Sequence, residues 1–400
     1  MNDINVWDWS NRRLFHRRDF LARMFPAMGG GAMLSAWPRS SRAWSLEGRR
    51  LKYVGWQVGV TYQASQRGGL DRDYLIRLLD EMAENRMNFL SLMMNSTVEN
   101  DPLHEGWCWP VRNPRLKGYW DSGSINGQPS TEYVHDVIVE ADHRGIEIML
   151  FTNGFWWTPE KIKKGYPSAG RQAFRDAMGK LHHAPYWFCP DSPEAWQVAL
   201  DEVADLLTYY KHPNVIGYGF EMLADGGCFC KWTQEKFRKE TGSSMLNAKA
   251  PQLSAWRARR VRGYLKEYGD HIRQLMTKAT VWLHADCVYA GHEPEGLKAS
   301  GVDYVFPLVA HMPTTKARLH TQLNRCSPMP CVLHFCTRDR RPKNYDLWIK
   351  TPKIIEQITD WILDYPGDNL VGLMFFNESA TSPHNKKAVY EQIKRFAWGG

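Results

Sequence analysis

Several patterns that would assign this chain to a common class are missing from its sequence. Beyond the first 43 of its 400 residues, no stretch is apolar enough to form a membrane helix. The segment 57–62 (QVGVTY) has no glycine-rich phosphate turn, which an open dinucleotide-binding sheet places after its first strand. The eight cysteines show no paired C-x-x-C zinc pattern, and no repeat or linker is visible. We therefore expect one folded domain.

An excess of basic charge is also absent from most of the chain. The formal net charge is +8, but residues 1–50 contain nine arginines and four acids, which account for +5 of it. The rest of the chain is close to balanced. The overall charge therefore gives no reason to expect a nucleic-acid partner.

The basic N-terminus has the features of an export signal. Arginines cluster within residues 11–18, and a moderately apolar run follows at 25–37 that is too short to span a membrane. Residues 17–21 (RRDFL) resemble the twin-arginine export motif. We expect residues 1–43 to be a signal peptide and residues 44–400 the mature bacterial protein. That protein would be periplasmic or extracellular, with no stable membrane insertion after export and with its disulfide pairing left open.

Beyond this leader, short β-rich runs alternate with helical patterns to the end of the chain. Strands rich in Val, Ile, Leu and Phe, each followed by a helix, are typical of a parallel sheet buried on both faces. Eight such units predict an α/β fold of the closed (β/α)8 TIM-barrel type in a single domain. The expected strands are residues 53–61, 88–95, 146–153, 214–221, 280–288, 302–311, 330–337 and 370–378.

The fourth of these strands ends on a carboxylate. Residues 212–221 read as the end of a helix at Pro213, then a glycine-punctuated apolar strand that stops at Glu221. A (β/α)8 barrel places its catalytic groups at the carboxyl ends of its strands. The other polar side chains expected there are Gln57, Asn95, Asn153, His284, Asp286, His311, His334, Asn377 and Glu378.

Long loops rich in aromatic residues follow the second and third strands. Trp156, Trp157 and Trp187 come from the loop that we expect at residues 154–190. Aromatic faces stack on sugar rings, while amides, histidines and carboxylates form hydrogen bonds with hydroxyl groups. The composition of this predicted cleft therefore favours a carbohydrate as substrate.

The residues around Glu221 carry a family resemblance. The runs 189–193 (CPDSP), 209–213 (YYKHP) and 215–221 (VIGYGFE) resemble glycoside hydrolases of the clan-A barrel type. Residues 228–237 are similar to a C-x-C-x-x-C-x-x-x-F element that follows the fourth strand in some of them. Thr233 replaces the third cysteine, which argues against a metal or disulfide role. The resemblance implies a glycosidase without a cofactor, in which Glu221 is the general acid/base.

The chain departs from this family pattern in two places. Phe220 stands where the family has an asparagine, and the seventh strand ends in 334–337 (HFCT) without the family's nucleophilic glutamate. An Asn-Glu pair occurs instead at the eighth strand, as Asn377 and Glu378.

Two candidates for the second catalytic carboxylate follow, with different stereochemical outcomes. Inverting glycosidases separate their carboxyl groups by about 6.5–9.5 Å, and retaining ones by about 5–5.5 Å. Glu378 lies across the barrel from Glu221 and predicts inversion. Asp286 lies on the neighbouring strand and predicts retention or a shared-proton pair. We favour Glu378 from the sequence.

Two other functions remain open at this point. His284, His311 and His334 end successive strands and, with Asp286 or Glu221, would suit a zinc hydrolase. The first strand lacks the His-x-His motif of barrel metallohydrolases, so we expect no metal. The missing seventh-strand glutamate also fits a carbohydrate-binding barrel that has lost catalysis. The oligomeric state cannot be read from the sequence.

Overall fold

A computed structural model shows the arrangement of most of the chain after the leader. The expected signal peptide, His311 and Asn377 lie outside the residues that it describes. These residues are 50–59, 72–96, 106–107, 109–118, 133–157, 159–176, 178–221, 227–289, 291–310, 314–339, 349–376, 378 and 381–398.

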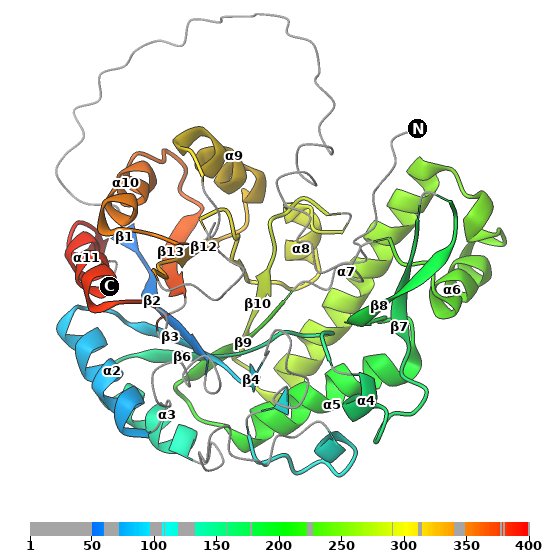
Figure 1. Ribbon diagram of the computed structural model, residues 1–400, viewed down its shortest axis with the longest axis horizontal. Helices are drawn as coiled ribbons and strands as arrows, with labels where there is room; N and C mark the ends of the chain where they lie inside the picture. The colour runs from blue at the N-terminus through cyan, green and yellow to red at the C-terminus, as the bar shows by residue number, and fades with distance from the viewer. Residues whose placement is uncertain are drawn as a thin grey trace, which may run out of the picture.

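Eight parallel strands close into a barrel, as the sequence predicts. Each strand pairs in parallel with the next one along the chain, and the eighth pairs with the first. Figure 1 shows the strands in the middle of the molecule with helices outside them. The strands are β2 (Tyr53–Gly59), β3 (Phe89–Met93), β6 (Glu147–Thr152), β9 (Val215–Glu221), β10 (Thr280–His284), β11 (Tyr304–Val305), β12 (Cys331–Cys336) and β13 (Leu370–Phe376).

Helices cover the outside of this barrel with their apolar faces turned inward. In α2 (Arg72–Glu84), for example, the buried residues are Leu75, Leu78, Leu79 and Met82, at the spacing of one helix face. The other helices along the chain are α3 (Val134–His143), α4 (Pro159–Ile162), α5 (Pro193–Tyr209), α6 (Lys231–Thr241), α7 (Ala250–Leu275), α8 (Pro294–Ala299), α9 (Lys316–Cys326), α10 (Pro352–Leu363) and α11 (Pro383–Ile393). The helices α8 and α9 were not predicted from the sequence.

The segment expected to be a long loop before α5 contains an antiparallel hairpin. Its strands are β7 (Arg171–Arg175) and β8 (Leu181–Phe188), which extend beside α6 and away from the barrel ring in Figure 1. Two-residue pairs also join β4 (Asn95–Ser96) to β5 (Gly106–Trp107) and β1 (Arg50–Leu51) to β14 (Ala397–Trp398). Polar residues such as Gln172 and His182 interrupt the apolar pattern of the hairpin, so the sequence of this segment predicts a loop and not strands.

The barrel interior is filled by large side chains from alternate strand positions. Phe89 and Trp282 stack with ring centroids 5.1 Å apart, and Tyr53 contacts both rings. Met149, Phe306, Val332 and Met374 belong to the same buried cluster. Because these side chains fill the barrel interior, no ligand can enter it. Functional side chains are therefore expected at the carboxyl ends of the strands.

Glycines in β9 make room for this interior packing. A Cβ at Gly217 would lie 2.4 Å from the Thr280 carbonyl oxygen, and one at Gly219 would lie 2.9 Å from the Met149 sulfur. The glycine-punctuated pattern therefore lets β9 pack closely against its neighbours and fixes where Glu221 emerges.

Among the described residues, no helix has the length and apolar character needed to cross a membrane.

Candidate functional site

Glu221 is the last residue of β9 and lies beside the last residue of β10. The parallel register aligns Glu221 directly with His284. The Nδ1 atom of His284 is 3.7 Å from Oε1 of Glu221, and the side chains are 8% and 30% exposed, respectively. Glu221 is therefore held against a buried imidazole while part of its carboxylate still meets solvent.

Two histidines and three phenylalanines line the interior next to Glu221. The His284 ring stacks on Phe306 at 4.9 Å and meets the ring of His334 edge-on at 5.2 Å. His334 also contacts Phe376 at 4.9 Å, while Phe306 contacts Phe151. Burial lowers the pKa of His334 well below its ordinary value, and the charge of His284 adds to this effect. A neutral imidazole at the end of β12 can both donate and accept hydrogen bonds.

The predicted amide side chains are buried and partly engaged with the protein. Gln57 is 1% exposed, and its Nε2 donates to the Ser91 hydroxyl at 3.2 Å. The Asn95 side-chain oxygen accepts from the backbone N–H of Asn153 at 3.1 Å. Gln57 and Asn95 thus tie neighbouring strand ends together. Asn153 itself is 8% exposed and lies one residue beyond β6.

The three predicted tryptophans occupy two different environments. Trp156 and Trp187 are half-buried and paired through a β-bridge, with ring centroids 5.0 Å apart. Trp157 is buried in the core between the barrel and the helices, and its Nε1 donates to Glu202 at 3.0 Å. The expectation that Trp157 lines a sugar site is therefore corrected, because its ring and its N–H are both enclosed by protein.

Asp286 lies two residues beyond the end of β10. Its Oδ1 accepts from the backbone N–H of Leu308 at 2.8 Å, and its carbonyl oxygen accepts from the side chain of Gln322. The side chain is only partly buried. Because β10 is one of the two strands that pair with β9, Asp286 follows a strand adjacent to the one that ends at Glu221.

Glu378 occupies a different kind of position from the one that its sequence context suggested. Its side chain is fully buried, where it pairs with Lys386 of α11 and accepts a hydrogen bond from Tyr74 of α2. The carboxylate is thus enclosed between the first turns of two helices. Its contacts fit a structural role better than the role of second catalytic carboxylate favoured from the sequence.

The two departures from the family pattern have structural counterparts. Phe220 points out of the barrel and packs on Tyr268 of α7, with ring centroids 4.9 Å apart. It therefore belongs to the core between the barrel and the helices. The inward positions at the end of β12 are His334 and Cys336. Cys336 belongs to the interior cluster, and His334 contacts Phe376 of the same cluster, so neither position is a carboxylate.

Two buried cations near the end of β12 were missed in the sequence. Arg338 is 7% exposed and its guanidinium lies 5.8 Å from the centre of the Phe376 ring. Lys350 is 2% exposed, and burial lowers its pKa. For Arg338 a signal was available, because three arginines occur directly after a predicted strand, within residues 338–341.

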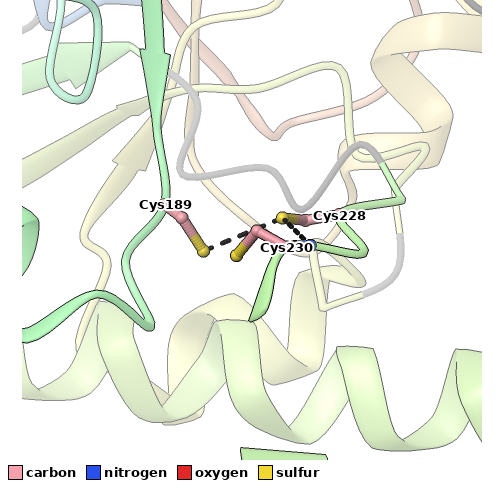
Figure 2. A group of neighbouring side chains, drawn as sticks. All are labelled: Cys189, Cys228 and Cys230. Carbon is pink, nitrogen blue, oxygen red and sulfur yellow. Dashed lines mark hydrogen bonds between the residues drawn. The ribbon is translucent and has the colours of Figure 1, made fainter. Parts of the chain in front are cut away.

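The strand-end histidines do not assemble a metal site in the part of the chain that the structure describes. The group found there with metal-ligand geometry consists instead of Cys189, Cys228 and Cys230, whose sulfur atoms all lie within 4.8 Å of one another. Figure 2 shows the three side chains converging from the turn after β8 and from the segment before α6.

Comparisons with known proteins support the fold but name no family for the chain. No family model and no curated protein sequence matches it. Among solved structures, it is similar to the PgaB (BpsB) glycoside hydrolase domain from Bordetella bronchiseptica. The identity is 14% and the TM-score 0.62, over 86% of this chain and 99% of that one.

Two larger glycosidases share the same fold. A β-galactosidase from the haloarchaeon Halorubrum lacusprofundi has 11% identity and a TM-score of 0.59, over 86% of this chain and 57% of that one. The GH20 exo-β-N-acetylglucosaminidase from Vibrio harveyi has 12% identity and a TM-score of 0.55, over 88% and 55%. This chain thus spans little more than half the length of these two proteins. It has the (β/α)8 barrel fold that these solved glycosidases contain.

Proposed function

We propose that this protein is an exported glycoside hydrolase that cleaves O-glycosidic bonds in oligosaccharides or polysaccharide-derived glycosides. The observation that carries the proposal is the position of Glu221. Its carboxylate ends the fourth barrel strand, retains solvent exposure and lies 3.7 Å from a buried histidine. In its protonated form, this carboxyl group would donate a proton to the leaving glycosidic oxygen.

His284 would act on Glu221 as a positioning residue. Its Nδ1 faces the carboxylate, while its ring is held between Phe306 and His334. Such packing fixes the direction of the imidazole, so a proton on Nδ1 would hold Glu221 in one orientation. The neutral His334 imidazole next to it is suited to hydrogen bonding with a sugar hydroxyl.

Asp286 is the better supported candidate for the second carboxylate. Its Oδ1 is fixed by the Leu308 N–H, and it lies two residues beyond β10, the strand that pairs with β9. In that role it would attack the anomeric carbon or activate a water molecule, depending on the separation of the two carboxylates. Glu378 is a weaker candidate because Lys386 and Tyr74 enclose its carboxylate.

The substrate surface would combine these polar groups with the half-buried rings of Trp156 and Trp187. Trp156 lies four residues beyond β6, which pairs with β9, and its ring pairs with that of Trp187 in β8. Export by the twin-arginine route would place the enzyme in the periplasm or outside the cell, where polymeric glycans are accessible. This part of the proposal rests on residues 17–21 and the apolar run after them.

A glycan panel tests the proposal directly. The full chain is incubated with oligosaccharides of different linkage, and the anomer that forms first is identified by NMR. We expect hydrolysis of at least one glycan. A first product with the substrate's anomeric configuration would support Asp286 as a nucleophile, whereas the opposite configuration would require a carboxylate pair with room for water.

A matched pair of variants tests the role of Glu221. Glu221→Gln keeps the shape of the side chain and removes its proton donor, so we expect hydrolysis to fall by about 10²- to 10⁴-fold. Glu356→Gln, an exposed position on α10, serves as the control and should retain full activity. Undiminished hydrolysis by Glu221→Gln would refute the assignment. Glycan binding without turnover by the wild-type chain would instead favour a carbohydrate-binding barrel.

A further inference from the structure

The three clustered cysteines come from two separate segments of the chain. Cys189 follows β8 directly, while Cys228 and Cys230 lie between β9 and α6, and Cys230 is the residue before the first turn of α6. All three are buried. The sulfur atoms of Cys189 and Cys228 are 3.8 Å apart, and Figure 2 shows the three thiols turned toward one another.

A hydroxyl group completes this cluster as a fourth corner. The Thr233 Oγ1 atom lies 3.2 Å from the sulfur of Cys189, 3.3 Å from that of Cys230 and 3.4 Å from that of Cys228. The Thr233 side chain has no solvent exposure. Three sulfurs and one oxygen therefore lie close together, with Thr233 at the position where the family element has its third cysteine. Because its hydroxyl contacts all three sulfurs, the replacement does not by itself remove a fourth ligand, contrary to what the sequence had suggested.

Four of the distances among these atoms are close to those of a tetrahedral zinc site. Zinc–sulfur bonds of about 2.3 Å and a zinc–oxygen bond of about 2.0 Å imply sulfur–sulfur edges of about 3.8 Å and sulfur–oxygen edges of about 3.5 Å. The 3.8 Å edge between Cys189 and Cys228 matches this value, and the three edges to Thr233 are shorter by 0.1–0.3 Å. Small outward shifts would accommodate the ion.

A buried second layer of contacts orients the Thr233 hydroxyl. Thr233 donates its proton to Oδ2 of Asp191 at 2.6 Å, so its lone pairs are directed elsewhere, and the three sulfurs lie within reach. Oδ1 of Asp191 accepts from Nε of Arg260 at 2.8 Å and from the Tyr264 hydroxyl at 2.7 Å. In many metal sites, a carboxylate outside the coordination shell forms a hydrogen bond that orients a ligand side chain.

We propose that Cys189, Cys228, Cys230 and Thr233 bind one zinc ion. With four protein ligands the site is closed, so its role is structural. It would join the turn after β8 to the segment that leads from Glu221 into α6. Thiolate ligands favour zinc over hard cations such as magnesium. Arg260 and the nearby Lys236 would offset the negative charge of three thiolates and Asp191.

Packing of inert thiols and a disulfide are the competing interpretations. The sulfurs of Cys189 and Cys228 are too far apart for a bond, which requires about 2.05 Å, and one disulfide would leave the third thiol unpaired. Simple packing would not require a buried hydroxyl in contact with all three sulfurs. These alternatives predict different metal content and thiol reactivity.

The test begins with the full wild-type chain. The protein is purified without chelator, incubated with Zn²⁺ and desalted, and its metal content is measured by mass spectrometry. We expect one zinc ion per chain, with these three cysteines protected from iodoacetamide until zinc is removed. Replacement by Co²⁺ should give the absorption of tetrahedral thiolate coordination. A metal-free chain, or a disulfide between Cys189 and Cys228 in the peptide map, would overturn the proposal.

Variants at the fourth ligand separate zinc binding from simple packing. Thr233→Val keeps the volume and removes the oxygen, so the affinity for Zn²⁺ should fall by about 10- to 100-fold in a competition with a chromophoric chelator. Thr233→Cys supplies a fourth thiolate and should bind Zn²⁺ more tightly than the wild type. Cys331→Ser, at a buried cysteine of β12, is the control and should leave zinc binding unchanged. Equal affinity in all four proteins would refute Thr233 as a ligand.

Discussion

Two carboxylates that end barrel strands in the sequence differ completely in their surroundings. Glu221 is 30% exposed and faces a histidine, whereas Glu378 has no exposure and is held by Lys386 and Tyr74. The backbone explains the difference. Glu221 is still a strand residue, so its side chain follows the alternation of β9. Glu378 lies beyond the end of β13, where that alternation no longer applies. The surroundings of a strand-end carboxylate are therefore predictable only where the strand includes it. For Asp286 and Glu378, which each lie two residues beyond a strand, only the structure shows the contacts.

The same contrast separates the barrel mouth from the layer between barrel and helices. At the mouth, Glu221 and Asp286 are partly exposed and contact imidazole or backbone groups. In the helix layer, Glu378 and Glu202 are buried and held by neighbouring side chains. Under the proposed function the first pair would react with the substrate, whereas the second pair holds helices on the barrel.

The largest expected effect concerns Asp286. Asp286→Asn keeps an oxygen that can accept from the Leu308 N–H, so the fold should be retained. Without a nucleophile or base, glycan hydrolysis should fall by about 10²- to 10⁴-fold. Steady-state kinetics on the active glycan, with circular dichroism as the check on folding, measure this. Full activity in this variant together with an inactive, folded Glu378→Gln would reverse the assignment of the two carboxylates.

Glu378 should matter for stability. Glu378→Gln removes the fully buried partner of Lys386 and leaves it only its ion pair with the partly exposed Glu81 at 3.3 Å. Because breaking a buried pair costs about 3–5 kcal/mol when no partner remains, we expect a loss toward the lower end of this range. Urea denaturation at neutral pH measures this loss. The double variant Glu378→Gln with Lys386→Met removes both charges and should recover much of the stability. If the double variant were no more stable than the single one, the ion pair would not be the cause.

Glu202 should make stability depend on pH. Burial raises its pKa from 4.5 to about 7, despite the hydrogen bonds from Thr152 and Trp157. Between these values the folded chain retains a proton that the unfolded chain has released, so stability falls as pH rises through this window. The full loss is about 3 kcal/mol for a shift of this size. Glu202→Gln should flatten the pH dependence of unfolding by urea, and an unchanged slope would contradict the raised pKa.

The smallest effects should distinguish the two kinds of tryptophan. Trp187→Ala removes a half-buried ring next to Trp156, so we expect a KM about 3- to 10-fold higher for the active glycan and little change in stability. Trp157→Phe removes the hydrogen bond to Glu202 and should cost about 1 kcal/mol of stability with an unchanged KM. Thermal melts and kinetics on both variants measure these effects. The opposite pattern would place Trp157 in the site.

The candidate site was only partly predictable for reasons that particular residues make clear. Glu221 and His284 were identified because they are the last residues of regular strands, where the alternation of side chains is reliable. Glu378 was assigned by the same rule but lies beyond its strand. Trp157 could not be separated from Trp156 in the sequence, because adjacent aromatic residues differ only in the face to which they point. Arg338 and Lys350 were missed because 12 positions separate them, although the structure buries both near the end of β12.

The sequence by itself determined the barrel. Each strand is buried on both faces, so each appears as a short apolar run, and eight such runs separated by amphipathic helices leave little choice of architecture. Only the tertiary structure decided which polar groups meet. The sulfurs of Cys189 and Cys228 lie 3.8 Å apart although 39 positions separate them in the sequence. Glu378 contacts Lys386 of α11 and Tyr74 of α2. Burial patterns are local and readable along the chain, whereas contacts between polar side chains depend on where distant segments pack.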